Sequence, residues 1–112
     1  MKWGDGDLYI GDTRYSRYMK ALVGRLFKIL PLWEAGEETL GEYMKSLQLE
    51  LVGLYDFEPE LHDDEMFLSI IAVLQYLIDH PACEAGTVKR EVFRSIRMCN
   101  VLHDRYLPEV SK

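Results

Sequence analysis

The sequence predicts an all-α protein, a single small four-helix bundle-like domain around a buried central helix at about residues 64–79. The length of 112 residues fits one domain. Apolar residues recur at every third or fourth position in three segments, which is typical of helices with one buried face. A fourth segment, Met66 to Ile78, is apolar except at Ser69 and Gln75. Because a helix that is apolar nearly all round must be covered on most sides, we expect this segment to lie at the centre.

Residues 1–12 contain three glycines and three aspartates, which predicts an irregular lead-in or a short hairpin. Asp5 and Asp7 are spaced like the start of a calcium-binding loop. Tyr9, however, stands where the next oxygen ligand is needed, so we expect a solvated turn rather than a metal site.

The first helix is expected over residues 13–30. Asp12 or Thr13 is a suitable N-terminal cap, and Pro31 disfavours helical geometry in the residue before it. One face of the segment is apolar: Tyr15, Tyr18, Met19, Leu22, Val23, Leu26, Phe27 and Leu30. The opposite face is basic: Arg14, Arg17, Lys20, Arg25 and Lys28.

The second helix is expected over residues 38–55, after a connector in which Trp33 is anchored in the core. Two starts are open. Thr39 and Glu42 match a capping box, whereas a start at Glu37 would place carboxylates near the positive end of the helix dipole. Residues 56–61, which include Pro59, are expected to form a loop.

The central helix is expected to open at Asp63, Asp64 and Glu65 and to close just before Pro81. A turn over residues 81–86 leads to the last helix, residues 88–106, with Thr87 as its cap. The predicted buried stripe of that helix is Val88, Val92, Ile96, Cys99, Leu102 and Tyr106, with Phe93 and Met98 beside it.

The charges are segregated along the chain, whose formal net charge is −6. Residues 34–65 hold eleven acids and one base, and the first and last helices hold ten of the thirteen bases. Spacings of four and three residues place three bases of the last helix on one face: Arg90, Arg94 and Arg97. An acidic cluster precedes the central helix: Glu58, Glu60, Asp63 and Asp64. These residues are either paired within the molecule or solvated, or they contact a partner.

No sequence motif indicates an enzyme, a metal site or a cofactor. The histidines, which are His62, His80 and His103, form neither a His-Glu-x-x-His motif nor zinc spacing with cysteines. Cys83 and Cys99 are expected to be free thiols in a reducing cytoplasm, because no secretion signal is visible.

The function expected from the sequence is therefore that of a small, non-catalytic cytoplasmic protein that binds another protein. Its acidic cluster favours an inhibitor or immunity-type protein that masks a basic target. Self-association of basic and acidic faces is a second version. The alternative is a helix-turn-helix-like protein that binds nucleic acid through Arg90, Arg94 and Arg97, although a net acidic charge argues against it. No membrane association is expected.

Overall fold

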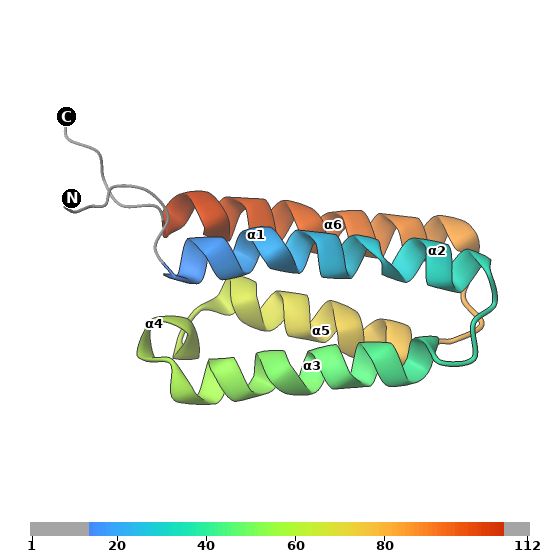
Figure 1. Ribbon diagram of the computed structural model, residues 1–112, viewed down its shortest axis with the longest axis horizontal. Coiled ribbons are helices and arrows are strands. Elements are labelled where there is room, and N and C mark those ends of the chain that lie inside the picture. Colours follow the sequence, from blue (N-terminus) through green and yellow to red (C-terminus); the bar gives the residue numbers. More distant parts are fainter. Residues whose placement is uncertain (1–13, 107–112) are drawn as a thin grey trace.

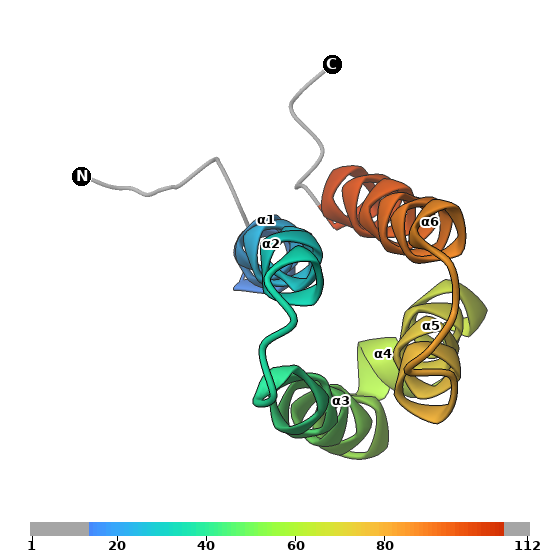
Figure 2. The same ribbon diagram turned by 90° about the vertical axis from the view of Figure 1, so that its right-hand side faces the viewer.

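The computed structural model describes residues 14–106, in which every regular element is a helix (Figure 1). The helices are α1 (Arg14–Phe27), α2 (Ile29–Glu34), α3 (Leu40–Phe57), α4 (Pro59–His62), α5 (Glu65–Asp79) and α6 (Ala85–Arg105). Helix α2 continues the line of α1, so the two form one rod. This rod and the helices α3, α5 and α6 run side by side as four antiparallel rods. Viewed from the end, the rods form a ring in the order α1–α2, α6, α5, α3 (Figure 2). The predicted all-α bundle is confirmed, whereas the predicted lead-in and the cap at Asp12 or Thr13 lie outside the described residues.

Helix α5 is one of the four rods, which corrects the prediction that the other helices surround it. Its inward face contributes six buried residues to the core: Phe67, Ile70, Ile71, Val73, Leu74 and Leu77. The outward face is not covered, since Leu68 is 44% exposed and Tyr76 is 40% exposed. In a ring of four rods each helix has only two neighbours, so even the most apolar one keeps an exposed side.

Pro31 does not end the first helical rod, as the sequence had suggested. Helix α1 ends at Phe27, and α2 begins at Ile29 and passes through Pro31 to Glu34. Pro31 lies in the first turn of α2, where the missing backbone N–H is tolerated, and the Leu32 N–H still donates to the Lys28 carbonyl at 3.3 Å. The rod is therefore divided at Lys28 into two helical segments, and Pro31 lies inside the second of them. Trp33, expected in a connector, is part of α2 and packs against the core.

Helix α3 begins at Leu40, so the predicted start at Thr39 is confirmed and the alternative start at Glu37 is wrong. Thr39 is the N-cap residue but makes no side-chain cap hydrogen bond, so the predicted capping box does not form. The helix continues to Phe57. The expected loop at residues 56–61 contains the short helix α4, which begins at Pro59 because proline suits the first helical position.

The two ends of α5 agree with the local sequence signals. Asp64 is the N-cap, and its Oδ1 accepts hydrogen bonds from the backbone N–H groups of Met66 and Phe67 at 3.0 and 3.1 Å. At the other end the His80 ring lies 2.8 Å from the Tyr76 carbonyl. Helix α6 begins at Ala85, earlier than predicted, and its N-cap is Glu84 rather than Thr87. Its buried stripe also includes Ser95, whose hydroxyl donates to the Val92 carbonyl at 2.6 Å.

Two glycines are expected to respond oppositely to alanine. Gly36 has a φ of 67° and ends α2 in a Schellman motif, with the Glu37 N–H donating to the Leu32 carbonyl at 3.1 Å. A Cβ at this φ costs about 1–2 kcal/mol, so Gly36→Ala should lower the free energy of unfolding. Gly53 lies inside α3, and a Cβ there meets no atom within 4 Å. Gly53→Ala should therefore stabilise the protein by about 1 kcal/mol. Urea denaturation of the two variants measures both effects, and equal stabilities would contradict the assignment of Gly36.

Candidate partner-binding surface

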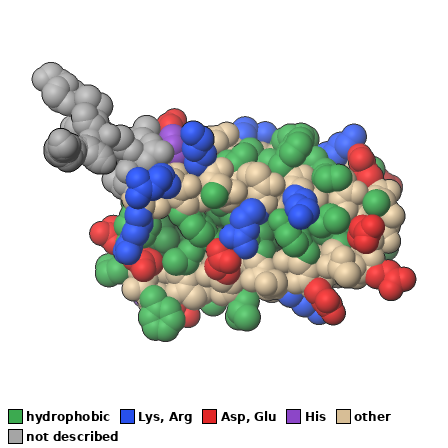
Figure 3. Space-filling model, viewed as in Figure 1, with side chains coloured by type: hydrophobic (Ala, Val, Ile, Leu, Met, Phe, Trp, Pro, Cys, Tyr) green, Lys and Arg blue, Asp and Glu red, His purple; other side chains and the backbone are tan. Residues whose placement is uncertain are grey.

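Charges of opposite sign lie on opposite sides of the bundle. Residues 14–28 and helix α6 together carry ten Lys or Arg residues and two acids. Residues 40–79 carry one lysine and nine acids. Helices α1 and α6 are neighbours in the ring, so their bases share one side of the molecule (Figures 2 and 3). This separation, which the sequence showed only along the chain, gives the folded protein a positive side and a negative side.

The three arginines singled out in the sequence are exposed on the positive side. Arg94 lies 3.0 Å from the carboxylate of Glu91, and Arg90 lies 3.6 Å from the same carboxylate. Arg97 makes no ion pair with any residue between 14 and 106. One acid is thus shared by two arginines, and the third is uncompensated. The structure leaves this charge available to a partner.

An exposed aromatic pair lies beside these arginines. The rings of Phe27 in α1 and Phe93 in α6 are 6.0 Å apart, and the side chains are 51% and 41% exposed. The sequence placed Phe27 in the buried stripe of its helix and Phe93 next to one. Both phenylalanines lie at the edge of a stripe and precede a base, Lys28 or Arg94, which is a sequence signal that could have indicated this surface. We call the surface formed by Phe27, Phe93, Arg90, Arg94 and Arg97 the basic–aromatic face.

The acidic cluster is largely engaged within the molecule. Glu58 accepts a hydrogen bond from Arg14 at 2.5 Å and another from the Tyr15 hydroxyl. The same hydroxyl lies 2.8 Å from Glu60, and this contact lowers the pKa of the Glu60 carboxyl. Asp63 is exposed. Two members of the cluster therefore hold α1 against the α3–α4 junction.

Asp64, the fourth member of the acidic cluster, is a structural residue. Its side chain is 4% exposed, and its Oδ2 lies 2.9 Å from Arg105 Nη1 and 3.0 Å from the Tyr106 hydroxyl. Burial and the neighbouring Asp64 raise the pKa of Tyr106 to about 12. The sequence proposed Asp64 as a partner-binding residue, but its carboxylate is occupied by these contacts and by its capping role.

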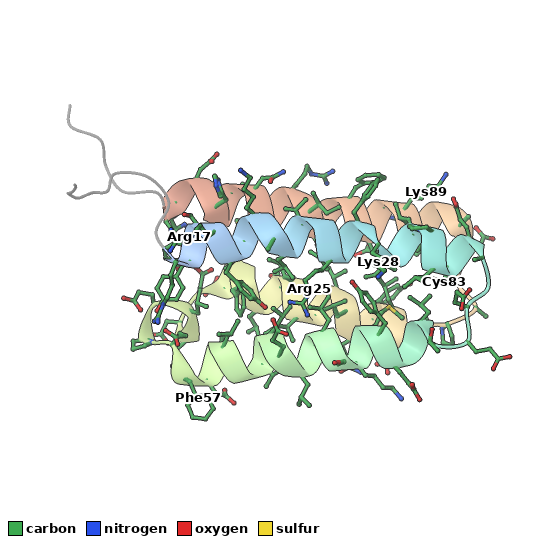
Figure 4. The ribbon with its side chains drawn as sticks, viewed as in Figure 1. Arg17, Arg25, Lys28, Phe57, Cys83 and Lys89 are labelled. Carbon is green, nitrogen blue, oxygen red and sulfur yellow. The ribbon has the colours of Figure 1, made fainter. Side chains whose placement is uncertain are left out.

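A second internal contact joins α1 to α3, its neighbour on the side opposite α6. Arg25 donates to both oxygens of Glu50, at 2.7 and 3.0 Å, and lies between the two helices (Figure 4). Arg25 and then Tyr18, whose hydroxyl also donates to Glu50, hold the pKa of that carboxyl below its usual range. Arg25 is thus paired inside the protein, unlike Arg97 of α6, which makes no ion pair with the described residues.

Within residues 14–106 the remaining candidate groups form no metal-binding cluster. This part of the chain contains no group of three His, Cys, Asp or Glu side chains placed to hold a metal ion. His62 lies 3.0 Å from the Tyr55 carbonyl, and His103 lies 3.2 Å from Asp104. Cys99 is buried in the core, which raises the pKa of its thiol to about 12. None of the helices in the described region has the length and apolar character needed to span a membrane.

The helix-turn-helix outline is not the geometry of α5 and α6. In that motif the two helices cross at about 90–120°, so that the second fits into a DNA groove. Helix α6 instead runs antiparallel to α5 along the bundle, after a connection at residues 80–84. The arginines of α6 consequently lie on a broad bundle side that also includes α1.

Comparison of the chain with protein-family models, curated proteins and solved structures finds no match in any of the three.

Proposed function

We propose that this protein works by binding another protein and that the basic–aromatic face is its contact surface. The observation that carries the proposal is an exposed aromatic pair, Phe27 and Phe93, beside arginines that have too few acids to neutralise them. Aromatic residues and arginine are enriched at protein interfaces and supply most of the strongly contributing contacts. The partner expected from this chemistry has an acidic surface around an apolar recess.

The charge distribution also supports recognition by this face. A positive side of the molecule attracts an acidic surface over several ångströms and raises the association rate at low salt. Once the surfaces meet, the two phenylalanines lose water and contribute apolar contact. The two free thiols favour a reducing compartment such as the cytoplasm as the place of this interaction.

The acidic cluster offers less support for an inhibitor that masks a basic target. Glu58 and Asp64 are paired with Arg14 and Arg105, so a partner would have to compete with these contacts. Self-association is the better second candidate, because the positive side of one copy is complementary to the nine acids within residues 40–79 of another.

Paired variants test the proposal. The double variant Phe93→Ala/Arg97→Ala removes one ring and one base from the basic–aromatic face. The control Phe57→Ala/Lys45→Ala makes the same kind of change on α3, where Phe57 is 84% exposed and projects away from the bundle (Figure 4). Tagged wild type and both variants are used to capture proteins from the native host's lysate, with and without nuclease. We expect a nuclease-resistant protein whose affinity falls at least about tenfold in the first variant and is unchanged in the control, since central interface residues each contribute 1 kcal/mol or more.

Three other outcomes contradict the proposal. Equal capture by both variants would show that the basic–aromatic face is not the contact surface. Capture that is lost after nuclease treatment would indicate nucleic acid as the partner. A particle mass that corresponds to an oligomer at low salt and to a monomer at 1 M salt, where screening shortens to about 3 Å, would indicate self-association.

A further inference from the structure

A pocket of about 390 Å³ lies at the end of the bundle that carries the 35–39 and 80–84 connections. The wall is mainly apolar and comes from α2, α3 and α5: Leu32, Trp33, Leu40, Met44, Leu77 and Ile78. Volumes of about 300–1,000 Å³ and predominantly apolar walls are typical of small-molecule sites. None of the residues of the basic–aromatic face lines this pocket. A ligand in the pocket would therefore be distinct from the protein partner proposed for that face.

The polar side chains in the pocket wall are hydrogen-bond acceptors rather than cations. Glu37 and Glu38 contribute carboxylates, and none of the described residues that line the pocket is a lysine or arginine. His80 also lines it, and its Nδ1 lies 2.8 Å from the Tyr76 carbonyl while its ring stacks on Tyr76. Because a carbonyl only accepts, Nδ1 carries the hydrogen, which leaves Nε2 of the neutral ring as an acceptor.

These features define the chemistry of a fitting ligand. An apolar body would replace water along the Leu, Met and Trp side chains. A cationic end would find carboxylates and an imidazole nitrogen, and charge-assisted hydrogen bonds of this kind are stronger than neutral ones. An anionic end would find no lysine or arginine among the described residues of the wall. We propose that this pocket binds a small amphipathic amine, with its apolar body in the pocket and its ammonium group at Glu37, Glu38 and His80.

A second copy of the chain is a poorer occupant. Phe57 is the most exposed large apolar side chain of the described residues and lies at the opposite end of the bundle. A head-to-tail contact would insert Phe57 of one copy into the pocket of another. Its neighbours Asp56 and Glu58, however, are acidic like Glu37 and Glu38. Like charges at such a contact oppose it.

Cys83 provides a built-in reporter for occupancy. It lines the pocket and is partly exposed. Figure 4 shows its position at this end of the bundle. The other cysteine, Cys99, is buried, so iodoacetamide should alkylate Cys83 selectively in the folded protein. A bound ligand should slow that alkylation, which mass spectrometry measures at each cysteine.

Matched variants of α3 control for access to the pocket. Gly41 lines it, and a Cβ at Gly41 meets no atom within 4 Å, so Gly41→Leu places a side chain in or beside the open volume. Gly53→Leu makes the same substitution in the same helix, also in open space and away from the pocket. Because both replace a helical glycine with a better helix former, both variants should remain folded.

The probes are n-octylamine, n-octanol and n-octanoate, which share a chain length and differ in charge. We expect n-octylamine to protect Cys83 at concentrations about tenfold lower than n-octanol, and n-octanoate not to protect it. Gly41→Leu should abolish protection, and Gly53→Leu should retain it. In the variant Glu37→Gln/Glu38→Gln, n-octylamine should protect Cys83 only at the concentrations at which n-octanol does.

Each alternative result overturns the proposal. Equal protection by n-octylamine and n-octanol in wild type would show an apolar site without preference for a cation. No protection by any probe, or the same protection in both glycine variants, would show that the pocket does not bind the amine. Protection that grows with protein concentration in the absence of a probe would identify a second copy of the chain as the occupant.

Discussion

Replacement of Phe67 with alanine is expected to lower the free energy of unfolding by about 3–5 kcal/mol. Phe67 is the largest of the fully buried side chains and lies in the first turn of α5, with 0% of its surface exposed. The substitution removes apolar contacts and leaves a cavity that neighbouring rods fill only in part. Because domains of this size are stable by about 5–15 kcal/mol in total, the variant should lose a large share of its stability. Urea denaturation followed by far-ultraviolet circular dichroism measures the change.

Phe57→Ala is the matched control for Phe67→Ala. Phe57 is 84% exposed, so its truncation should change the free energy of unfolding by less than about 0.5 kcal/mol. Equal losses in the two phenylalanine variants would contradict the arrangement of α3 and α5 described above.

Replacement of Asp64 with alanine is expected to cost about 2–3 kcal/mol of stability, although the residue lies at a helix end. The change removes both capping hydrogen bonds to α5 and the acceptor for Arg105 and Tyr106. The loss of a cap contributes about 1 kcal/mol, and hydrogen bonds to a charged group contribute about 1.5–3 kcal/mol. The expected loss of stability is smaller than the largest sum of these two contributions, because the Arg105 side chain is 49% exposed and solvent screens its ion pair with Asp64.

Two control variants separate the roles of Asp64. Asn caps helices well, so Asp64→Asn should keep the cap and lose only the ionic part, about half of the alanine effect. Asp63→Ala changes the exposed neighbour and should alter stability by less than about 0.5 kcal/mol. Thermal and urea denaturation of all three variants gives the ranking. A loss in Asp63→Ala as large as that in Asp64→Ala would rule out the capping and pairing roles.

Local signals predicted the helical segments well where they were unambiguous. The carboxylates at 63–65 and Pro81 bracket α5 almost as the structure has it, because a cap and a helix-stopping proline act within one turn. The helix end predicted before Pro31 and the loop predicted around Pro59 are wrong, because both prolines lie in the first turn of a helix. A proline is compatible with both the end of one helix and the first turn of the next, and the choice depends on packing of the residues that follow it.

The candidate surface was predicted in part. The spacing of Arg90, Arg94 and Arg97 placed them on one face of a helix, and all three are exposed. That spacing could not show that Phe27 of another helix lies beside Phe93, since the contact joins residues far apart in the sequence. The same limit applies to Asp64, whose partners Arg105 and Tyr106 lie more than forty positions away.

The all-α class, the apolar stripe of each helix and the segregation of acids from bases follow from the sequence alone, because periodicity and charge order are properties of neighbouring residues. The order of the rods around the ring is decided by the tertiary structure. It places α1 beside α6, which unites two basic helices on one side, and it leaves an outward face on α5. Which helices become neighbours depends on how side chains of distant segments interdigitate and on the reach of the connections, and neither is encoded within a single helix.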